Sequence, residues 1–312
     1  MLIFNIIFPI FAIAILGYTL AATGFLNKEH ITGISRYVFN IAIPLLLFNA
    51  ISNMDLPATI EWSLFLSFYI PSILIFIVMN LVGRYVFGYQ ATGHAAFGLG
   101  CCYGNTVLIG IPLVAASFGD EGLLPLLLII SIHAAIFLSA SIITAESGQG
   151  SAGKRLTGLD IVAIPIKKVV QNLLVVGLLT GLFFNYMDFA LPEAIERTIE
   201  FIRGSALPCA LLVMGASMSE YKLSGAVDKA MVIVVTKMVV HPLLVYLMAF
   251  HVFDLNPLWG AIVVIAASMP TGINAALLAR EYQAAVAPVS TAVLLSTLMA
   301  LGSIPVVLSL FL

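Results

Sequence analysis

Two stretches rich in glycine, proline and asparagine interrupt apolar segments of the chain, and they hold the side chains best suited to bind a small molecule. The first runs Tyr103-Gly-Asn-Thr-Val-Leu-Ile-Gly-Ile-Pro112, and the second runs Ser268-Met-Pro-Thr-Gly-Ile-Asn274. Proline removes a backbone donor and glycine relaxes the backbone, so both stretches predict a broken helix. We expect the residues that break the two helices to be Gly104, Gly110, Pro112, Pro270 and Gly272.

A helix that restarts after a break presents unpaired N–H groups and a partial positive charge, which suits an anionic ligand. Asn105 and Thr106 at the first break, and Thr271 and Asn274 at the second, would add side-chain hydrogen bonds. Asn49, in another apolar segment, could face the same ligand. These five polar residues form our predicted substrate-binding set. The alternative is that both breaks are proline kinks that serve helix packing only.

Three titratable side chains lie inside apolar segments and could carry charge or protons. Lys237 and His241 are four residues apart, so they share a helix face, and His133 lies midway along another segment. If these segments cross a membrane, a cation there is costly and usually functional, so Lys237 could balance the charge of a substrate or couple its movement to protons. The alternatives are that Lys237 snorkels to the membrane surface and that each histidine is hydrogen-bonded within the packing.

Several chemistries are excluded by motifs that the sequence lacks. It has no His-Glu-x-x-His motif for a zinc protease and no GxxxxGK[ST] loop for a nucleotide. Its three cysteines, Cys101, Cys102 and Cys209, offer neither zinc spacing nor an even disulfide set. The net charge of −2 gives no basic face for nucleic acid. We therefore expect no enzyme activity, no metal site, no cofactor and no nucleic-acid partner.

The composition places these residues in a polytopic, all-α membrane protein. Of the 312 residues, 62% are hydrophobic and 9% are charged, whereas a soluble domain has about 25% charged residues. The mean hydropathy is +1.13. A helix needs about 20 apolar residues to cross a bilayer. The chain divides into ten such segments: 2–22, 33–53, 62–86, 93–118, 121–144, 168–188, 199–218, 229–251, 257–279 and 286–312.

The longest polar gap follows the fifth segment and is rich in glycine and serine, which is typical of a flexible linker. It predicts a five-span repeat at 1–144, a linker at 145–166 and a second five-span repeat at 167–312. Ten Lys and Arg residues fall in the odd-numbered loops, and two fall in the even-numbered loops and the termini. Because positive loops stay in the cytoplasm, we predict a cytoplasmic linker and N- and C-termini outside.

Two halves of five spans each insert with opposite orientation, which is the arrangement of an inverted repeat. Sliding the chain by 164 residues superimposes the spans and brings Gly17 onto Gly181. The same shift places Thr106 on Pro270, so the two breaks lie at corresponding depths. Inverted repeats with interrupted helices are typical of secondary transporters, and the paired breaks favour a substrate site over two packing kinks.

The order and spacing of these motifs make the chain similar to the auxin efflux carrier family, which includes plant PIN auxin exporters and bacterial malate or malonate permeases. The resemblance covers essentially the whole chain. It rests on Gly17-Tyr18, Ile43-Pro44-Leu-Leu-Leu-Phe48, Gly104-Asn-Thr, Gly110-Ile-Pro-Leu113, Met269-Pro-Thr-Gly-Ile-Asn274 and Ala279-Arg-Glu-Tyr282. The central linker is short, unlike that of the plant exporters.

The resemblance implies a scaffold from spans 1, 2, 6 and 7 and a transport bundle from spans 3–5 and 8–10, in which the fourth and ninth helices cross. It implies a secondary transporter of small organic anions such as mono- or dicarboxylates, with the substrate bound at that crossing and no nucleotide hydrolysis. It suggests a homodimer through the scaffold. We expect the protein in a bacterial inner (plasma) membrane.

Two alternatives stay open within the transporter class. A sodium-coupled organic anion transporter similar to the bile-acid symporters shares the ten-span plan, and the coupling ion here could be H+ or Na+. No Asp or Glu lies in the centre of a span, so a sodium site would need neutral oxygens. An anion channel is the other alternative, although the sequence has no charged ring or repeated filter. The sequence does not decide between import and export.

Overall fold

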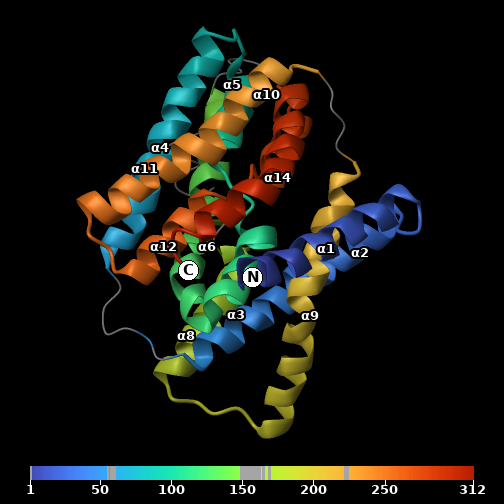
Figure 1. Cartoon of the computed structure of the whole chain (residues 1–312), viewed down its shortest axis with the longest axis vertical. Coiled ribbons are helices and arrows are strands. Elements are labelled where there is room, and N and C mark those ends of the chain that lie inside the picture. The colour runs from blue at the N-terminus through green and yellow to red at the C-terminus, as the bar shows by residue number, and fades with distance from the viewer. Residues whose placement is uncertain are drawn as a thin grey trace. The chain divides into compact units, whose positions relative to one another are not determined.

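The computed structural model describes residues 2–54, 56, 61–147, 163, 166–167, 170–220 and 225–312, and these are predominantly helical (Figure 1). Most of the predicted linker at 145–166 lies outside them. Seven helical runs in the described part are long and apolar enough to cross a membrane: Phe4–Ala22, Lys28–Ser52, Trp62–Tyr85, Thr106–Ser147, Glu193–Met218, Val227–Val252 and Val286–Leu308. The chain is therefore an all-helical integral membrane protein.

The chain forms two compact units. The first contains Met1–Ile60, Val107–Ser131 and Val169–Glu220, and the second contains Glu61–Thr106, Ile132–Lys168 and Tyr221–Leu312. The predicted spans 1, 2, 6 and 7 fall in the first unit. Spans 3, 8, 9 and 10 fall in the second, while spans 4 and 5 are divided between the two.

The helices of the first unit are α1 (Leu2–Ala22), α2 (Lys28–Tyr37), η1 (Val38–Ala42), α3 (Ile43–Ser52), the start of α6 (Ile111–Ser147), α8 (Leu173–Tyr186) and α9 (Glu193–Met218). Gly119 divides α6, because its φ of 63° and ψ of −157° are not helical. This division lies between the fourth and fifth predicted spans.

In the part of the chain that the structure describes, the second unit contains the end of α6 and seven further α-helices. These are α4 (Trp62–Tyr85), α5 (Ala91–Cys102), α10 (Val227–Val235), α11 (His241–Leu247), α12 (Pro257–Ala267), α13 (Ile273–Glu281) and α14 (Val286–Leu308). The π-helices η4 (Thr236–Val240) and η5 (Met248–Val252) join and extend α10 and α11 into one continuous run, drawn in orange in Figure 1. A further π-helix, η2 (Thr106–Gly110), leads into α6.

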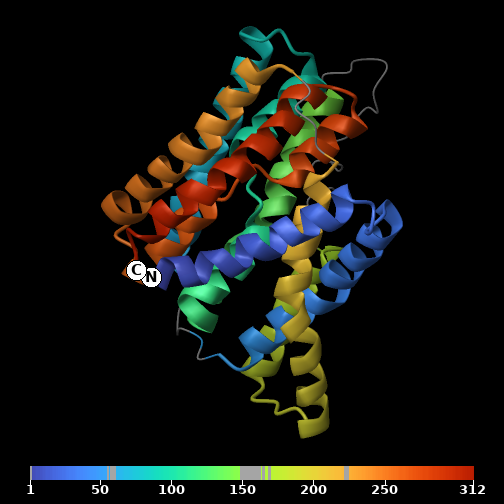
Figure 2. The same ribbon diagram turned by 45° about the vertical axis from the view of Figure 1, so that its right-hand side comes forward.

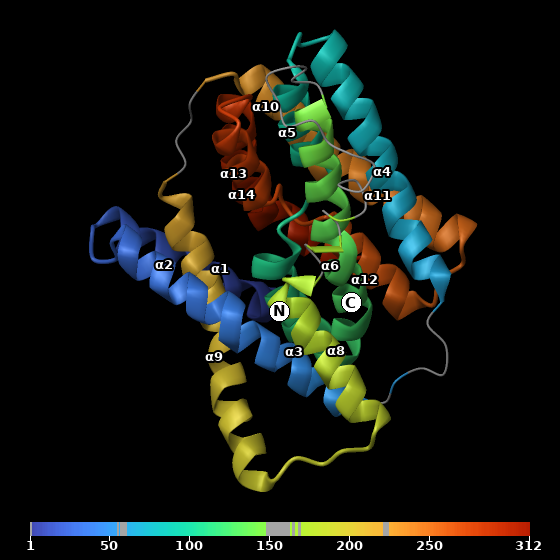
Figure 3. The ribbon, with the colours of Figure 1, turned by 180° about the vertical axis from the view of Figure 1, so that it is seen from behind.

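Glycines set the helix packing in the first unit. The helix α1, in dark blue in Figure 2, lies across α9, in gold. A Cβ built on Gly17 would collide with the carbonyl oxygen of Leu212, and one built on Gly215 would collide with that of Ala14. Figure 3 shows α3 beside α8, where a Cβ on Gly181 would lie 2.8 Å from the carbonyl oxygen of Phe48. These helices touch backbone to backbone, which side chains larger than hydrogen would prevent.

In the second unit, a polar pair joins α4 to α5. The Nδ2 atom of Asn80 donates to the carbonyl oxygen of Phe76 at 2.8 Å, and its Oδ1 atom lies 2.9 Å from Nδ1 of His94. Gly98 leaves room for this amide, because a Cβ there would collide with it. Asn80 therefore holds these two helices together.

Tyr282, which belongs to the last of the motifs that resemble the auxin efflux carriers, lies in the turn after α13. Its hydroxyl donates to the carboxylate of Glu146 at the end of α6, over 2.8 Å. Burial raises the pKa of the Tyr282 hydroxyl, and the neighbouring carboxylate raises it further. The bond fixes the turn to α6.

Three π-helices each end two residues before a proline. They are η1 before Pro44, η2 before Pro112 and η4 before Pro242. A proline cannot donate a backbone hydrogen bond and its ring clashes with the carbonyl four residues earlier, and a wider turn relieves both problems. The prediction that Gly110 and Pro112 break a helix is therefore wrong, because Gly110 ends η2 and Pro112 lies in the first turn of α6.

Gly215→Ala is expected to lower the thermal stability of the detergent-purified protein, because its methyl group must push α9 away from Ala14. Overpacking of this kind costs about 1–3 kcal/mol. Gly204→Ala on the same helix is the matched control, since nothing lies within 4 Å of its Cβ position. Alanine there should keep or raise the midpoint of unfolding. Equal midpoints for the two variants would contradict this account of the packing.

Candidate functional site

Two interrupted helices meet in the second unit through their main chains. The helix α5 ends at Cys102 and α12 ends at Ala267, and the extended residues that follow form an antiparallel bridge between Gly104 and Thr271. The N–H of Asn105 donates to the carbonyl oxygen of Pro270, and the N–H of Gly272 donates to that of Tyr103, both at 2.8 Å. The breaks at Gly104, Pro270 and Gly272 lie where the sequence predicts them.

The register of this pairing differs from the register predicted by the 164-residue shift. A shift of 167 residues places Tyr103 on Pro270 and Asn105 on Gly272. The donor and acceptor of one hydrogen bond then correspond to the donor and acceptor of the other. Under the 164-residue shift, Thr106 would fall on Pro270 instead. The apolar spans on either side fix register poorly, so the 164-residue match places the individual breaks correctly but relates the two breaks to each other with an offset of three residues.

Asn105 and Thr106 are buried polar residues whose side chains have no hydrogen-bond partner among the residues that the structure describes. Asn105 is 9% exposed and Thr106 is 3% exposed, at the start of η2. Their side-chain polar atoms are not among the enclosed, unpartnered atoms of the described residues, so these atoms reach open space next to the break. A polar ligand at the start of η2 would provide the missing partners.

Thr271 and Asn274, from the same predicted set, are already hydrogen-bonded. The hydroxyl of Thr271 donates to the carbonyl oxygen of Gly100 at 3.1 Å, and its N–H donates to the hydroxyl of Ser296. Thr271 therefore ties the second break to α5. The Nδ2 atom of Asn274 donates to the Tyr103 hydroxyl at 3.1 Å, which leaves the other amide hydrogen and the amide oxygen for a ligand.

Tyr103 is a residue that the sequence reasoning missed as a candidate. It is 7% exposed, it accepts the hydrogen bond from Asn274, and its ring stacks on that of His133. Tyr103 is the first residue of the first glycine-rich stretch. The signal in the sequence that could have identified it is its place as an aromatic residue directly before a helix break. Aromatic side chains in apolar segments are usually packing residues, which is why their type alone does not reveal such a role.

Lys237 is completely buried beside the point where the two extended segments cross. Its Nζ atom donates to the carbonyl oxygen of Ala267, the last residue of α12. A Cβ on Gly104 would lie 3.3 Å from Cε and Nζ of Lys237, so the lysine lies against the first break as well. A cation is favourable at a helix C-terminus, where carbonyl groups are unpaired. The alternative that Lys237 snorkels to the membrane surface is wrong.

The two predicted histidines have different surroundings. The Nε2 atom of His241 lies 2.7 Å from the hydroxyl of Ser72 on α4, while its Nδ1 atom has no partner in the described part of the chain. His133 is 2% exposed, and neither of its ring nitrogens has a hydrogen-bond partner there. The ring of His133 contacts a group of aromatic rings, from Phe68, Tyr69, Tyr103 and Phe137. The alternative that His133 is hydrogen-bonded within the packing finds no support among the described residues.

The whole chain has known relatives. Residues 2–308 match the family described as "Membrane transport protein". The chain belongs to this family, that of the auxin efflux carriers. The "Putative malonate transporter" of Rhizobium meliloti (strain 1021) is 23% identical over 96% of this chain and 93% of its own length.

Two further relatives match over nearly their whole lengths. An "Uncharacterized transporter" of Methanothermobacter thermautotrophicus is 26% identical over 96% of this chain and 95% of its own length. The "Auxin efflux carrier component 8" of Arabidopsis thaliana is 23% identical over 91% of this chain and 92% of its own length. The protein is therefore a membrane transporter of this family.

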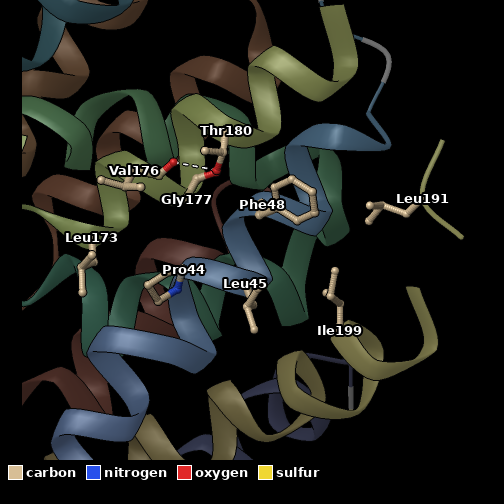
Figure 4. Close-up of a pocket in the computed structure, with 9 residues that line it drawn as sticks. All are labelled: Pro44, Leu45, Phe48, Leu173, Val176, Gly177, Thr180, Leu191 and Ile199. Carbon is tan, nitrogen blue, oxygen red and sulfur yellow. Dashed lines mark hydrogen bonds between the residues drawn. The ribbon is translucent and has the colours of Figure 1, made fainter. Parts of the chain in front are cut away.

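The first unit of this transporter holds Asn49 and an apolar pocket. Asn49 lies on α3, is 8% exposed, and has no side-chain partner among the described residues. The pocket, shown in Figure 4, has a volume of about 330 Å³ and is lined by Pro44, Leu45, Phe48, Leu173, Val176, Gly177, Thr180, Leu191 and Ile199. The Thr180 hydroxyl is bound to the carbonyl oxygens of Val176 and Gly177. This apolar pocket has no free polar side chain to bind an anion.

Thr271→Val is expected to destabilise this transporter by about 1–3 kcal/mol, because it leaves the buried carbonyl oxygen of Gly100 without its donor. Thr297→Val is the matched control, since the Thr297 hydroxyl donates to Val293 within its own helix. The midpoint of thermal unfolding in detergent should fall for Thr271→Val and change little for Thr297→Val. A larger fall for Thr297→Val would show that Thr271 does not hold the crossing.

Proposed function

We propose that this protein is a secondary active transporter of small organic anions, such as mono- or dicarboxylates, with the substrate bound at the crossing of the two interrupted helices. The observation that carries the proposal is the main-chain pairing at this crossing together with the side chains of Asn105 and Thr106 beside it, which have no hydrogen-bond partner among the described residues. Irregular backbone inside a membrane is tolerated where it is buried in protein or lines a cavity. Family membership supports transport, and the name of the Rhizobium relative supports a carboxylate.

The groups at the crossing favour an anion over a cation. Helices restart there at Thr106 and at Ile273, and no side chain caps the N–H groups that open α13. The nitrogen of Lys237 lies against the first break. N–H groups at helix starts and a lysine supply positive potential, while amide and hydroxyl groups of Asn105, Thr106 and Asn274 supply neutral hydrogen bonds. Asn49 and Thr271 stay predicted members of the site.

We further propose ten membrane spans in two inverted repeats, with a scaffold from spans 1, 2, 6 and 7. Helix packing in the first unit supports this. Gly17 packs against Leu212, and Gly181 packs against Phe48. A shift of 164 residues relates Gly17 to Gly181 and Phe48 to Leu212, so it converts one contact into the other. Two contacts that exchange under one shift are what a twofold-related repeat produces. Alternating access by movement of one bundle against the other follows from that symmetry.

The remaining features of the proposal come from the sequence. They are a cytoplasmic linker, termini outside, a bacterial inner membrane, a homodimer through the scaffold, and transport without an enzymatic step or a bound cofactor. Coupling to H+ or Na+ is open, with Lys237, His241 and His133 as the buried groups that could carry charge or protons. Both ring nitrogens of His133 and Nδ1 of His241 have no partner in the described part of the chain, which favours examining protons first.

The experiment that tests the function is a thermal-shift screen of purified protein against mono- and dicarboxylates, at varied pH and sodium, followed by uptake into proteoliposomes. A ligand that binds the folded state raises its apparent stability by mass action. We expect a selective shift with a small dicarboxylate, and saturable uptake of the same compound. Absence of uptake or exchange of every carboxylate tested would overturn the proposal, and rapid ohmic current would favour a channel.

Asn105→Ala and Asn274→Ala are expected to weaken binding of the acid found in that screen by about tenfold or more, as loss of a hydrogen bond to a charged group does. Asn80→Ala is the control, because Asn80 binds Phe76 and His94. It should cost stability and leave the dissociation constant of the folded protein unchanged. Equal affinities for all three variants would remove the crossing from the binding site.

Lys237→Met is expected to reduce transport of dianions more than transport of monoanions, because the variant keeps most of the side-chain volume and loses the charge next to the crossing. Uptake of one labelled dicarboxylate and one labelled monocarboxylate, measured on the same proteoliposomes, gives the ratio directly. The surface variant Lys28→Met serves as the control for loss of one positive charge, since that side chain is 82% exposed. An unchanged ratio would show that Lys237 does not balance substrate charge.

A further inference from the structure

Tyr103 occupies a position where a side chain can reach both interrupted helices. It is the residue directly after α5, with an extended backbone at φ −86° and ψ 111°. Its carbonyl oxygen accepts from the N–H of Gly272, and its hydroxyl accepts from Asn274 in the first turn of α13. One residue therefore joins the end of α5 to the start of α13 through its main chain and its side chain.

The ring of Tyr103 is held on two sides. A Cβ built on Gly272 would lie 2.6 Å from Cδ1 of the ring, so the ring lies directly along the glycine backbone. The imidazole of His133 stacks on the ring with centroids 4.5 Å apart and planes inclined by 24°. Because the ring has little freedom, its hydroxyl stays at the N-terminal turn of α13.

The hydrogen-bond arrangement at this hydroxyl leaves its hydrogen unused. Asn274 donates through Nδ2, so the Tyr103 oxygen is the acceptor. A phenolic hydroxyl can also donate once. No acceptor for that hydrogen is found among the residues that the structure describes, and Tyr103 is 7% exposed. A buried donor without an acceptor, placed where a helix begins, is suited to a carboxylate oxygen.

We propose that the Tyr103 hydroxyl donates a hydrogen bond to a carboxylate of the bound substrate and orients the amide of Asn274 toward the same group. Tyr103 is then a binding and specificity residue of the carrier, selecting an ionised carboxylate over groups that can only donate. This inference rests on the proposed function, since it places the organic anion at the start of α13.

The test compares malonate binding to the purified protein and to Tyr103→Phe by calorimetry. The variant keeps the ring, its stack on His133 and its place along Gly272, and loses only the hydroxyl. We expect malonate affinity to fall about tenfold or more, as for a lost hydrogen bond to a charged group. Tyr246→Phe on α11, where the ring packs against Phe250, is the control and should bind malonate like the parent protein.

A second measurement separates a donor from a packing residue. In a double-mutant cycle, the losses of malonate affinity in Tyr103→Phe and Asn274→Ala should be non-additive, because the Tyr103 hydroxyl and the Asn274 amide position each other. A fluorinated tyrosine placed at 103 loses its hydrogen at a lower pH. Malonate binding to that protein should therefore be lost as pH rises, at a pH where the parent protein still binds. A role in packing alone would not move this pH dependence.

The outcomes are distinguishable. If the parent protein binds malonate and both Tyr103→Phe and the fluorinated protein bind it equally well at every pH, the inference about Tyr103 is overturned and the proposed function stands. If the parent protein binds and transports no carboxylate, the proposed function is overturned and the inference falls with it. If Tyr103→Phe fails to fold, the pH dependence of the fluorinated protein decides.

Discussion

The backbone pairing of two extended segments, at Gly104 and Thr271, is the constraint on which the arrangement of the second unit depends. Each interrupted helix leaves backbone donors and acceptors that a membrane interior cannot satisfy with water. The two breaks satisfy each other instead, through Asn105 with Pro270 and Gly272 with Tyr103. Two interruptions that would be unstable separately are thus stable together, because each supplies hydrogen bonds that the other lacks.

The side chains around this pairing complete the backbone bonding at the helix ends. Thr271 binds a carbonyl oxygen near the end of α5, and Lys237 binds the last carbonyl oxygen of α12. Groups inside the protein therefore bind carbonyl oxygens at the C-terminal ends of α5 and α12, while no side chain caps the N-terminal end of α13 in the described part of the chain. That asymmetry leaves positive potential available and negative potential covered, which is the basis for an anionic substrate.

The sequence predicts the membrane class and the breaks at Gly104, Pro270 and Gly272, because apolar length and the chemistry of Gly and Pro are local properties. Partners across helices are not local. Neither the burial of Lys237 against Ala267 nor the aromatic surroundings of His133 follow from spacing along one helix. Tyr103 was overlooked for the same reason, since its role depends on contacts with Asn274 and His133 from other segments. The prediction that Gly110 and Pro112 break a helix failed because a wider helical turn can also accommodate a proline, and the sequence does not show which of the two occurs.

The π-helices change which residues of this chain share a helix face. A π-helix holds one more residue per turn than an α-helix, so it acts as a one-residue insertion and rotates all later side chains by about 100°. In the run from Val227 to Val252, η4 begins just before Lys237. The lysine reaches α12, whereas His241, four residues later, reaches Ser72 on α4. A substitution that restored regular α-helical winding at Pro242 would turn every residue beyond it toward a different neighbour.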